Sequence, residues 1–494
     1  MAFDEQEYKR NRTVVKKIFQ CVDFLVRQKW AVTENTEKLA RFVASMGDSD
    51  LKAHCDNTSS KTSYLSSHSV TQMVQCISDF HERELLSQMK DKEISLLADE
   101  STDIANRSQL CVMTRCGNSD GDVATIFLGF VNLTKGTAEA IMEAIKSFLQ
   151  ARDIDLAKIR FIALDGCNTM SGEHKGLQRR IRHESPFALF VNCRNHRLAL
   201  CLVHLIKRYP VLQEIDSTLL ALWKLFEFSP QKLAVFKHIQ SVYGKEPLTI
   251  LRAATTRWLS HLHASSRFIS RYNCILDTLD ALYEDKKDPE VYGIRASITK
   301  KSLLAGILLL CDILKPVHML SLYLQHEDIN FTMLPIHVKE TIDLLHLLVE
   351  NYQRNQLQDT EYQKCGDLFS EVDDRTNLAR RMRAGAHELT PESFLEQTGI
   401  PLIYDLIQEI EDAFCTGSSV LPSFGILDPH NLPDTVQELS DYNQESINRF
   451  VESYGTAKDD TFQGQRVQVR AQFEPVALRA ELENFKRHLS MLSL

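Results

Sequence analysis

The chain has 494 residues, 44% of them hydrophobic and 25% charged, and a formal net charge of −9. This composition is that of a globular protein with several domains, and it excludes extensive disorder and a generally basic, histone-like nucleic-acid binder. Residues 351–494 hold 13 basic and 24 acidic residues, a net of −11, which leaves +2 for the first 350. Any nucleic-acid surface is therefore expected in the first 350 residues.

The first 90 residues predict a helical region. Apolar side chains recur at helical spacing, as at Val14, Ile18 and Val22 and again at Val70 and Met73. The N-terminus has no secretory apolar segment, and the twelve cysteines include no C-x-x-C pair. We therefore expect free thiols, a reducing compartment and no signal peptide.

Shorter apolar runs follow and predict alternating strands and helices. Strands are expected at 93–98, 110–116, 124–131, 159–164 and 187–192, and helices at 138–150, 173–183 and 194–208. Three strands joined by short turns form an antiparallel meander, whereas a strand reached through a helix pairs in parallel by a right-handed crossover. The pattern predicts a mixed five-stranded sheet with flanking helices, in which the first and fourth strands can be neighbours.

The remainder of the chain predicts an all-α region. Helical spacing is seen at 212–228, 269–283, 303–325, 336–351 and 401–414. The most apolar run, residues 303–311, is too short to cross a bilayer, so a buried helix and no membrane partner are expected. We divide the chain into an N-terminal helical region (1–90), an α/β core (91–265) and a helical, insertion-type domain with an acidic C-terminal part (266–494).

Two aspartates end predicted strands. If the strands that end at Asp99 and Asp165 are parallel neighbours, both carboxylates emerge at one end of the sheet. Such carboxylates repel each other, and a hard cation such as Mg²⁺ relieves that cost. Two such ions can activate water for phosphodiester cleavage. Taken singly, each aspartate is better explained as a turn residue or helix cap, and only the pair favours a metal site.

Four segments carry a family resemblance. They are LLADESTDIANRSQL (96–110), ALDGCNTMSGEHKGLQRRI (163–181), FVNCRNHRLAL (190–200) and TTRWLS (255–260). In order, they resemble the two acidic blocks, the Cys-x-x-His block and the Arg-Trp block of hAT (hobo/Activator) transposases. The N-terminal part is similar to the domesticated zinc finger protein 862-like group of vertebrates. The resemblance implies a ribonuclease-H-like core and a location in the nucleus, or in nucleus and cytoplasm.

The resemblance also implies roles for individual residues. Asp99 and Asp165 match the two catalytic acids, here interpreted as vestigial, and Cys193 with His196 matches the Cys-x-x-His pair. Asp103 is a weaker candidate because it lies in the following turn. Trp258, after Arg257, matches a tryptophan that stacks near a DNA hairpin or flipped base, although an ordinary core position is an equal alternative.

The second acidic block also predicts a basic helix. Ser171 is expected to cap it, with Glu173 in its first turn. Its face would carry Lys175, Arg179, Arg180 and Arg182, which could meet DNA phosphates close to Asp165 or simply be a solvated surface.

A zinc site is not expected. Cys193, His196, Cys201 and His204 fall along one helical stripe and cannot close a tetrahedron around an ion. The only cofactor expected is Mg²⁺ or Mn²⁺, weakly bound by Asp99 and Asp165.

Two parts of an intact transposase find no match. Neither a BED-type zinc finger nor the C-terminal dimerisation block, which supplies the third acid, is recognised, and Glu474, Glu481 and Glu483 have the pattern of an exposed helix. We predict a domesticated or degenerate transposase without transposition activity, with DNA or other nuclear proteins as partners and no small-molecule substrate. Two alternatives stay open, an active metal-dependent nuclease or transposase and a purely protein-binding helical scaffold.

Overall fold

The structure is a computed structural model that describes residues 5–492 apart from 58–62, 118–121, 254–257, 327–328, 330–332, 377–388, 415–419, 428–432, 434–441 and 443. The chain divides into two compact units, residues 1–162 and 163–494. The three-part division made from the sequence stays a prediction, because the two units are defined by contacts between residues and the three parts by sequence pattern and resemblance.

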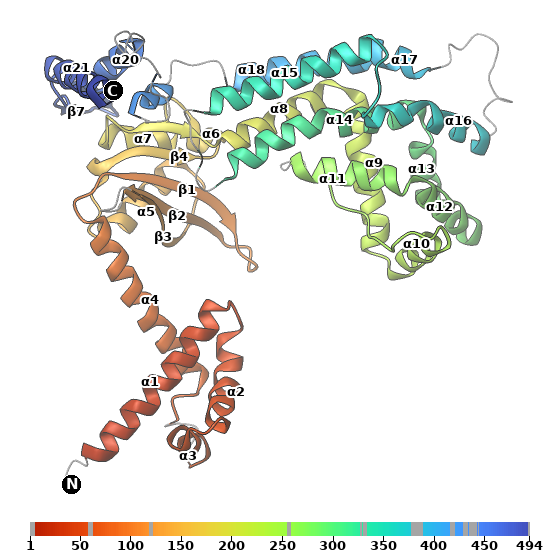
Figure 1. Ribbon diagram of the computed structural model, residues 1–494. Coiled ribbons are helices and arrows are strands. Elements are labelled where there is room, and N and C mark those ends of the chain that lie inside the picture. Colours follow the sequence, from red (N-terminus) through yellow and green to blue (C-terminus); the bar gives the residue numbers. More distant parts are fainter. Residues whose placement is uncertain are drawn as a thin grey trace. The chain divides into compact units, whose positions relative to one another are not determined.

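The first unit begins with four helices, in the region that was predicted to be helical. They are α1 (Glu5–Arg27), α2 (Val32–Ser45), α3 (Ser49–Asn57) and α4 (Ser67–Met89) (Figure 1). Ser66 starts α4, because its side chain accepts a hydrogen bond from the Ser69 amide. The inward faces share one apolar cluster that includes Val14, Ile18, Leu51 and Val70.

The five predicted strands form a mixed, ribonuclease-like sheet. They are β1 (Ile94–Thr102), β2 (Ser108–Gly117), β3 (Val123–Asn132), β4 (Ile159–Leu164) and β5 (Leu189–Asn192), in the order β3-β2-β1-β4-β5. The first three are antiparallel, and β1 and β4 are neighbours, as predicted. Helix α5 (Ala138–Gln150) has the predicted bounds, starts at its cap Thr137 and buries Ile141, Ile145 and Leu149. The short helix η1 (Leu156–Lys158) leads into β4.

The hairpin of β1 and β2 is longer than expected, and it corrects the position of Asp99. The residue lies within β1, opposite Cys111, and the ladder continues to the pair Thr102 and Ser108. Pairing continues because the turn comes later, where Asp103 Oδ1 accepts the amides of Ala105 and Arg107, each at 2.8 Å. Asp103 therefore lies in the turn, as predicted.

The second unit is mostly helical. Short helix α6 (Asn168–Ser171), α7 (Leu177–Glu184) and α8 (Arg194–Arg208) accompany β5. The helix expected at 269–283 starts later, because α11 ends at Ser270 and α12 starts at Tyr272, on either side of Arg271. The further helices are α9 (Pro210–Glu227), α10 (Pro230–Val242), α11 (Trp258–Ser270), α12 (Tyr272–Lys286), α13 (Pro289–Ile298), α14 (Lys301–Leu324), α15 (Leu334–Gln353), η2 (Glu361–Lys364), α16 (Cys365–Thr376), α17 (Pro391–Phe394), η4 (Leu395–Gly399), α18 (Ile400–Phe414) and η5 (Leu421–Leu427).

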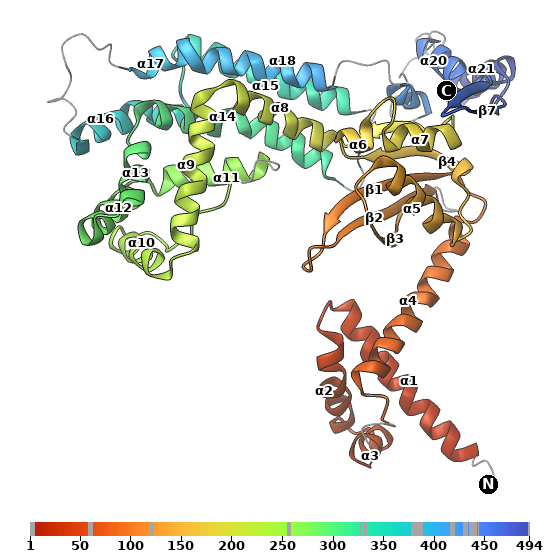
Figure 2. The same ribbon diagram turned by 180° about the vertical axis from the view of Figure 1, so that it is seen from behind.

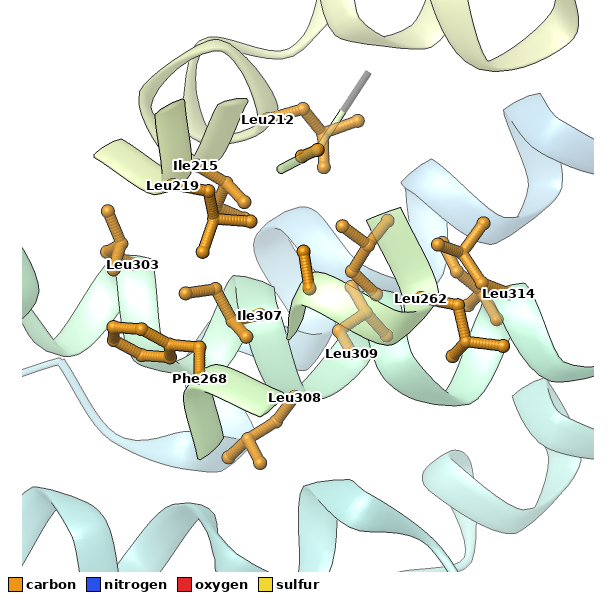
Figure 3. Close-up of a cluster of buried hydrophobic side chains, with 14 of the residues drawn as sticks. Leu212, Ile215, Leu219, Leu262, Phe268, Leu303, Ile307, Leu308, Leu309 and Leu314 are labelled. Carbon is orange, nitrogen blue, oxygen red and sulfur yellow. The ribbon is translucent and has the colours of Figure 1, made fainter. Parts of the chain in front are cut away.

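Helix α14 is the centre of this unit. Its Leu303, Ile307 and Leu308 pack with residues of α9 and α11, such as Ile215 and Phe268 (Figure 3). Among the described residues, α14 alone is long and apolar enough to cross a membrane, and 78% of that stretch is buried inside the protein. The helix is thus a core helix that extends well beyond the apolar run seen in the sequence.

Near its C-terminus the second unit contains a hairpin that the sequence analysis missed. Strands β6 (Lys458–Phe462) and β7 (Gln465–Val469) lie between α20 (Gln444–Tyr454) and α21 (Pro475–Leu492). Gln463 and Gly464 both have positive φ, 50° and 82°, as a two-residue hairpin turn requires. The glutamates Glu474, Glu481 and Glu483 are exposed.

Candidate nucleic-acid interface

Asp165 follows β4 directly, as predicted, and opens a tightly bonded loop. The half-buried side chain accepts the Cys167 amide at 3.3 Å through Oδ1. Ser171 ends α6, with its hydroxyl within hydrogen-bonding distance of the carbonyl oxygens of Gly166 (3.0 Å) and Cys167 (2.9 Å). The prediction that Ser171 caps the next helix is therefore wrong, because its hydroxyl bonds backward.

Two glycines set the start of α7. The Gly176 amide donates to the Gly172 carbonyl at 3.0 Å, and a Cβ built on Gly176 would lie 2.5 Å from that same oxygen. The two backbones touch, so a turn occupies the place where a helix from residue 173 was predicted. Glu173 and Lys175 lie exposed in this turn.

The Cys-x-x-His pair supports the Asp165 loop. The Cys193 amide donates to the Leu164 carbonyl at 2.9 Å, at the end of β4. A Cβ built on Gly166 would lie 2.9 Å from His196 Cδ2, so the imidazole packs against the residue that follows Asp165. The Cys193 backbone and the His196 ring therefore both contact the Asp165 loop.

The other two residues of the stripe face α18. His204 Nδ1 lies 2.8 Å from a Glu409 carboxylate oxygen, and the Cys201 thiol donates to the Glu409 carbonyl at 3.4 Å. Burial raises the pKa of Cys201 to about 12, with a further contribution from Glu409, so the thiol is protonated at neutral pH. Within the described residues, no three His, Cys, Asp or Glu side chains are grouped to hold a metal ion.

The predicted basic face of α7 is not uniformly exposed. Lys175 and Arg182 are exposed, whereas Arg180 is buried and its Nε donates to the Lys175 carbonyl at 3.3 Å. The Arg179 side chain, 20% exposed, donates to both carboxylate oxygens of Asp460 in β6, at 2.7 and 2.8 Å. Only two of the four cations on this segment are therefore open to solvent.

Asp460 is the centre of a compact cluster. His183 Nδ1, on the next turn of α7, lies 3.0 Å from Asp460 Oδ2. The Phe462 ring centroid lies 4.8 Å from the Arg179 guanidinium carbon and 5.4 Å from that of Arg180. Burial opposes ionisation of Asp460, but hydrogen bonds from Arg179 and His183 outweigh it and lower the pKa of the carboxyl group. Arg179 and His183 thus bind an anionic group, which in this structure is the Asp460 carboxylate.

Three members of this cluster escaped the sequence analysis. His183 carries a weak signal, since it lies four residues after Arg179 on one helical face. Asp460 and Phe462 carry none, because 281 residues separate Asp460 from Arg179. The strands on either side of Gly464 are short and mostly polar, so their periodicity does not reveal the hairpin or its partner.

The remaining predicted site residues divide between the two units. Asp99 is exposed in β1 of the first unit, and burial together with the Asp99 charge raises the pKa of Cys111 opposite. Arg257 lies outside the described residues. Trp258 begins α11, and its side chain also lies outside them. Roles in catalysis or DNA contact stay predictions for all three.

Comparison with known proteins adds two findings. Residues 2–176 match a family model described as "DUF4371: ZMYM1/FAM200, RNase-like domain". The human "52 kDa repressor of the inhibitor of the protein kinase" is 20% identical over 449 residues, which cover 83% of this chain and 57% of that protein. The chain thus spans little more than half the length of this relative. Both similarities support a transposase-derived protein with a ribonuclease-like core.

Proposed function

We propose that the chain is a domesticated hAT-type transposase that acts in the nucleus as a nucleic-acid-associated module and no longer performs transposition. One observation carries the proposal. The second motif block keeps its fold-building residues, with Asp165 after β4 and Gly172 against Gly176, while its Arg179 is bound by Asp460. The motif thus serves the scaffold, and a cation expected to face phosphates is neutralised. The human relative carries the name of a repressor, which is in keeping with a regulatory role.

Nucleic-acid association should be electrostatic and weakly selective for sequence. Exposed Lys175 and Arg182 can meet backbone phosphates, which carry no sequence information. Replacing both by Ala should weaken duplex binding and reduce the salt slope by up to about two units. Glu173→Gln, in the same exposed turn, is the control for a local change of charge and should not weaken binding.

Loss of catalysis is tested directly with purified protein. Plasmid and hairpin DNAs incubated with the chain and Mn²⁺ should stay intact, because a two-metal mechanism requires both ions to be held in the correct geometry. Nicking that disappears in Asp165→Asn would contradict the proposal and favour an active nuclease.

We propose that the two ancestral acids bind a metal ion only weakly. Asp99 and Asp165 offer carboxylate oxygens, the ligand type that Mg²⁺ and Mn²⁺ prefer, and such sites usually draw further ligands from substrate phosphates. Calorimetric titration with Mn²⁺ should show affinity on the order of millimolar that is lost in Asp99→Ala. Tight binding that survives this change would point to another site.

Protein binding is a second candidate function, favoured by one surface. Helix α15 buries Val338, Ile342 and Leu345 yet leaves Leu344 and Leu347 about half exposed, at 51% each. Exposed apolar side chains grouped on one helix are typical of protein interfaces. Absence of duplex binding at low salt would favour this function over the first.

A further inference from the structure

We propose that Arg179 and His183 of α7 form a binding site for a backbone phosphate of a nucleic acid, and that Asp460 of the β6–β7 hairpin occupies this site in the structure described above. The ligand class rests on the proposed nucleic-acid function. Two parts of the inference go beyond that function: Asp460 covers the phosphate site, and a bound phosphate displaces it.

The geometry at Asp460 is that of a phosphate site. Arg179 presents two parallel N–H bonds of 2.7 and 2.8 Å to the two carboxylate oxygens, and His183 adds a third contact of 3.0 Å. A guanidinium fork fits two oxygens of a phosphodiester as it fits those of a carboxylate. Asp460 therefore stands where a phosphate would bind.

The site has one polar atom that Asp460 does not use. The His183 side chain is 5% exposed, and within the described part of the chain its Nε2 is buried without a hydrogen-bond partner. Most buried polar atoms in proteins have a hydrogen-bond partner. The cluster thus has more hydrogen-bonding capacity than one carboxylate satisfies.

The two sides of the contact differ in how firmly they are held. Helix α7 buries Leu177, Gln178 and Ile181 as well as Arg180 and His183. Neither strand of the hairpin has a buried residue. This holds even though β7 and the flanking helices α20 and α21 are drawn beside α7 in Figure 2. A two-stranded hairpin without a buried face is marginally stable by itself. The basic helix is consequently a fixed site, and the hairpin is the part that can leave.

Asp459 provides a matched control beside Asp460. Successive strand residues point to opposite faces, and Asp459 pairs with Arg466 of β7, inside the hairpin. Removing either carboxylate changes the net charge of the chain by the same amount. Only the loss of Asp460 releases Arg179.

The test measures binding of the full chain to a fluorescein-labelled 20-base-pair duplex by anisotropy at several salt concentrations. Asp460→Asn should bind about fivefold tighter than the wild type at low salt, and its salt slope should increase by roughly one unit as Arg179 gains a phosphate. Asp459→Asn should bind like the wild type. Adding Arg179→Gln to Asp460→Asn should remove the gain, and this double variant has the same loosened hairpin.

Each outcome decides between the proposals. Equal gains in Asp459→Asn and Asp460→Asn would reflect overall charge and overturn the inference. If Asp460→Asn binds the duplex as the wild type does, Asp460 has only a structural role. This outcome would overturn the inference and leave the proposed function intact. Failure of the wild type and of Asp460→Asn to bind the duplex would remove the nucleic-acid function and the inference together.

A second measurement uses the wild type alone and does not depend on the folding of a variant. If a phosphate displaces Asp460, saturating duplex should increase hydrogen exchange in residues 458–469 and leave exchange in α14 unchanged. Unchanged or slower exchange in the hairpin of DNA-bound protein would overturn the inference.

Discussion

One aspartate in each β-hairpin pairs with an arginine, and the two arginines lie at very different distances along the chain. In the β1–β2 hairpin, Asp103 pairs with Arg107, four residues away and 70% exposed. In the β6–β7 hairpin, Asp460 pairs with Arg179, 281 residues away and 20% exposed. The first pair shapes its own turn, and the second attaches its hairpin to a distant helix. The same two residue types thus serve a local conformation in the first pair and a tertiary contact in the second.

This difference predicts unequal energies. An exposed, local ion pair contributes about 0–1 kcal/mol, because water screens it and side-chain entropy opposes it. A desolvated group that loses its partner costs about 1–3 kcal/mol, since nothing replaces the lost bonds. The Asp460 cluster leaves two such groups, Arg179 and His183, and should show the larger effect.

The largest effect is expected for Asp460→Ala. The change removes the carboxylate that Arg179 and His183 contact and should reduce the free energy that holds the hairpin on α7 by about 2–3 kcal/mol. Hydrogen exchange in residues 458–469 measures that free energy. In Asp459→Ala the hairpin keeps its contact with α7, so its protection should be close to that of the wild type, and equal losses in both variants would contradict the comparison.

Acid should reproduce this effect in the wild type. The pKa of Asp460 is lowered in the folded protein, so its contribution to stability is present above the pKa of the unfolded chain and is lost as the pH falls through the folded value. Protection of residues 458–469 should therefore decrease below about pH 4. Asp460→Asn should abolish this step, and a step that persists in that variant would assign it to another carboxyl group.

A smaller and local effect is expected for Asp103→Ala. The variant loses two hydrogen bonds to the turn amides of Ala105 and Arg107, at a cost of about 1 kcal/mol. Exchange should increase at residues 101–109 and remain unchanged at 458–469. Faster exchange that extends along β1 as far as Leu96 would contradict this prediction, because the turn would then stabilise the whole strand pair.

The sequence was most informative where local rules decide the structure. Helix α5, strand β4 and helix α8 have their predicted bounds, because apolar spacing, a capping Thr137 and strand length are local properties. The early end predicted for β1 at Asp99 and the helix predicted from residue 173 failed because apolar spacing encodes neither the length of the β1–β2 ladder nor the close contact of Gly176 with Gly172.

The candidate site was only partly predictable because its central contact joins residues that are far apart in the sequence. Lys175, Arg179, Arg180 and Arg182 could be grouped by motif, but no sequence rule separates the exposed cations from the buried Arg180 or from the neutralised Arg179. The partner of Arg179 comes from a hairpin of five-residue strands with mostly polar side chains, whose periodicity is too short to stand out within a helical region.

The contact between Gly172 and Gly176 has an evolutionary consequence. Any side chain at position 176 would meet the backbone of residue 172, so the turn admits no other residue there without opening. Nothing in this restriction depends on Asp165 or on catalysis. In descendants of one ancestral transposon, loss of the acids should therefore precede loss of these glycines. The glycine pair would mark common descent in lineages where the chemistry has already decayed.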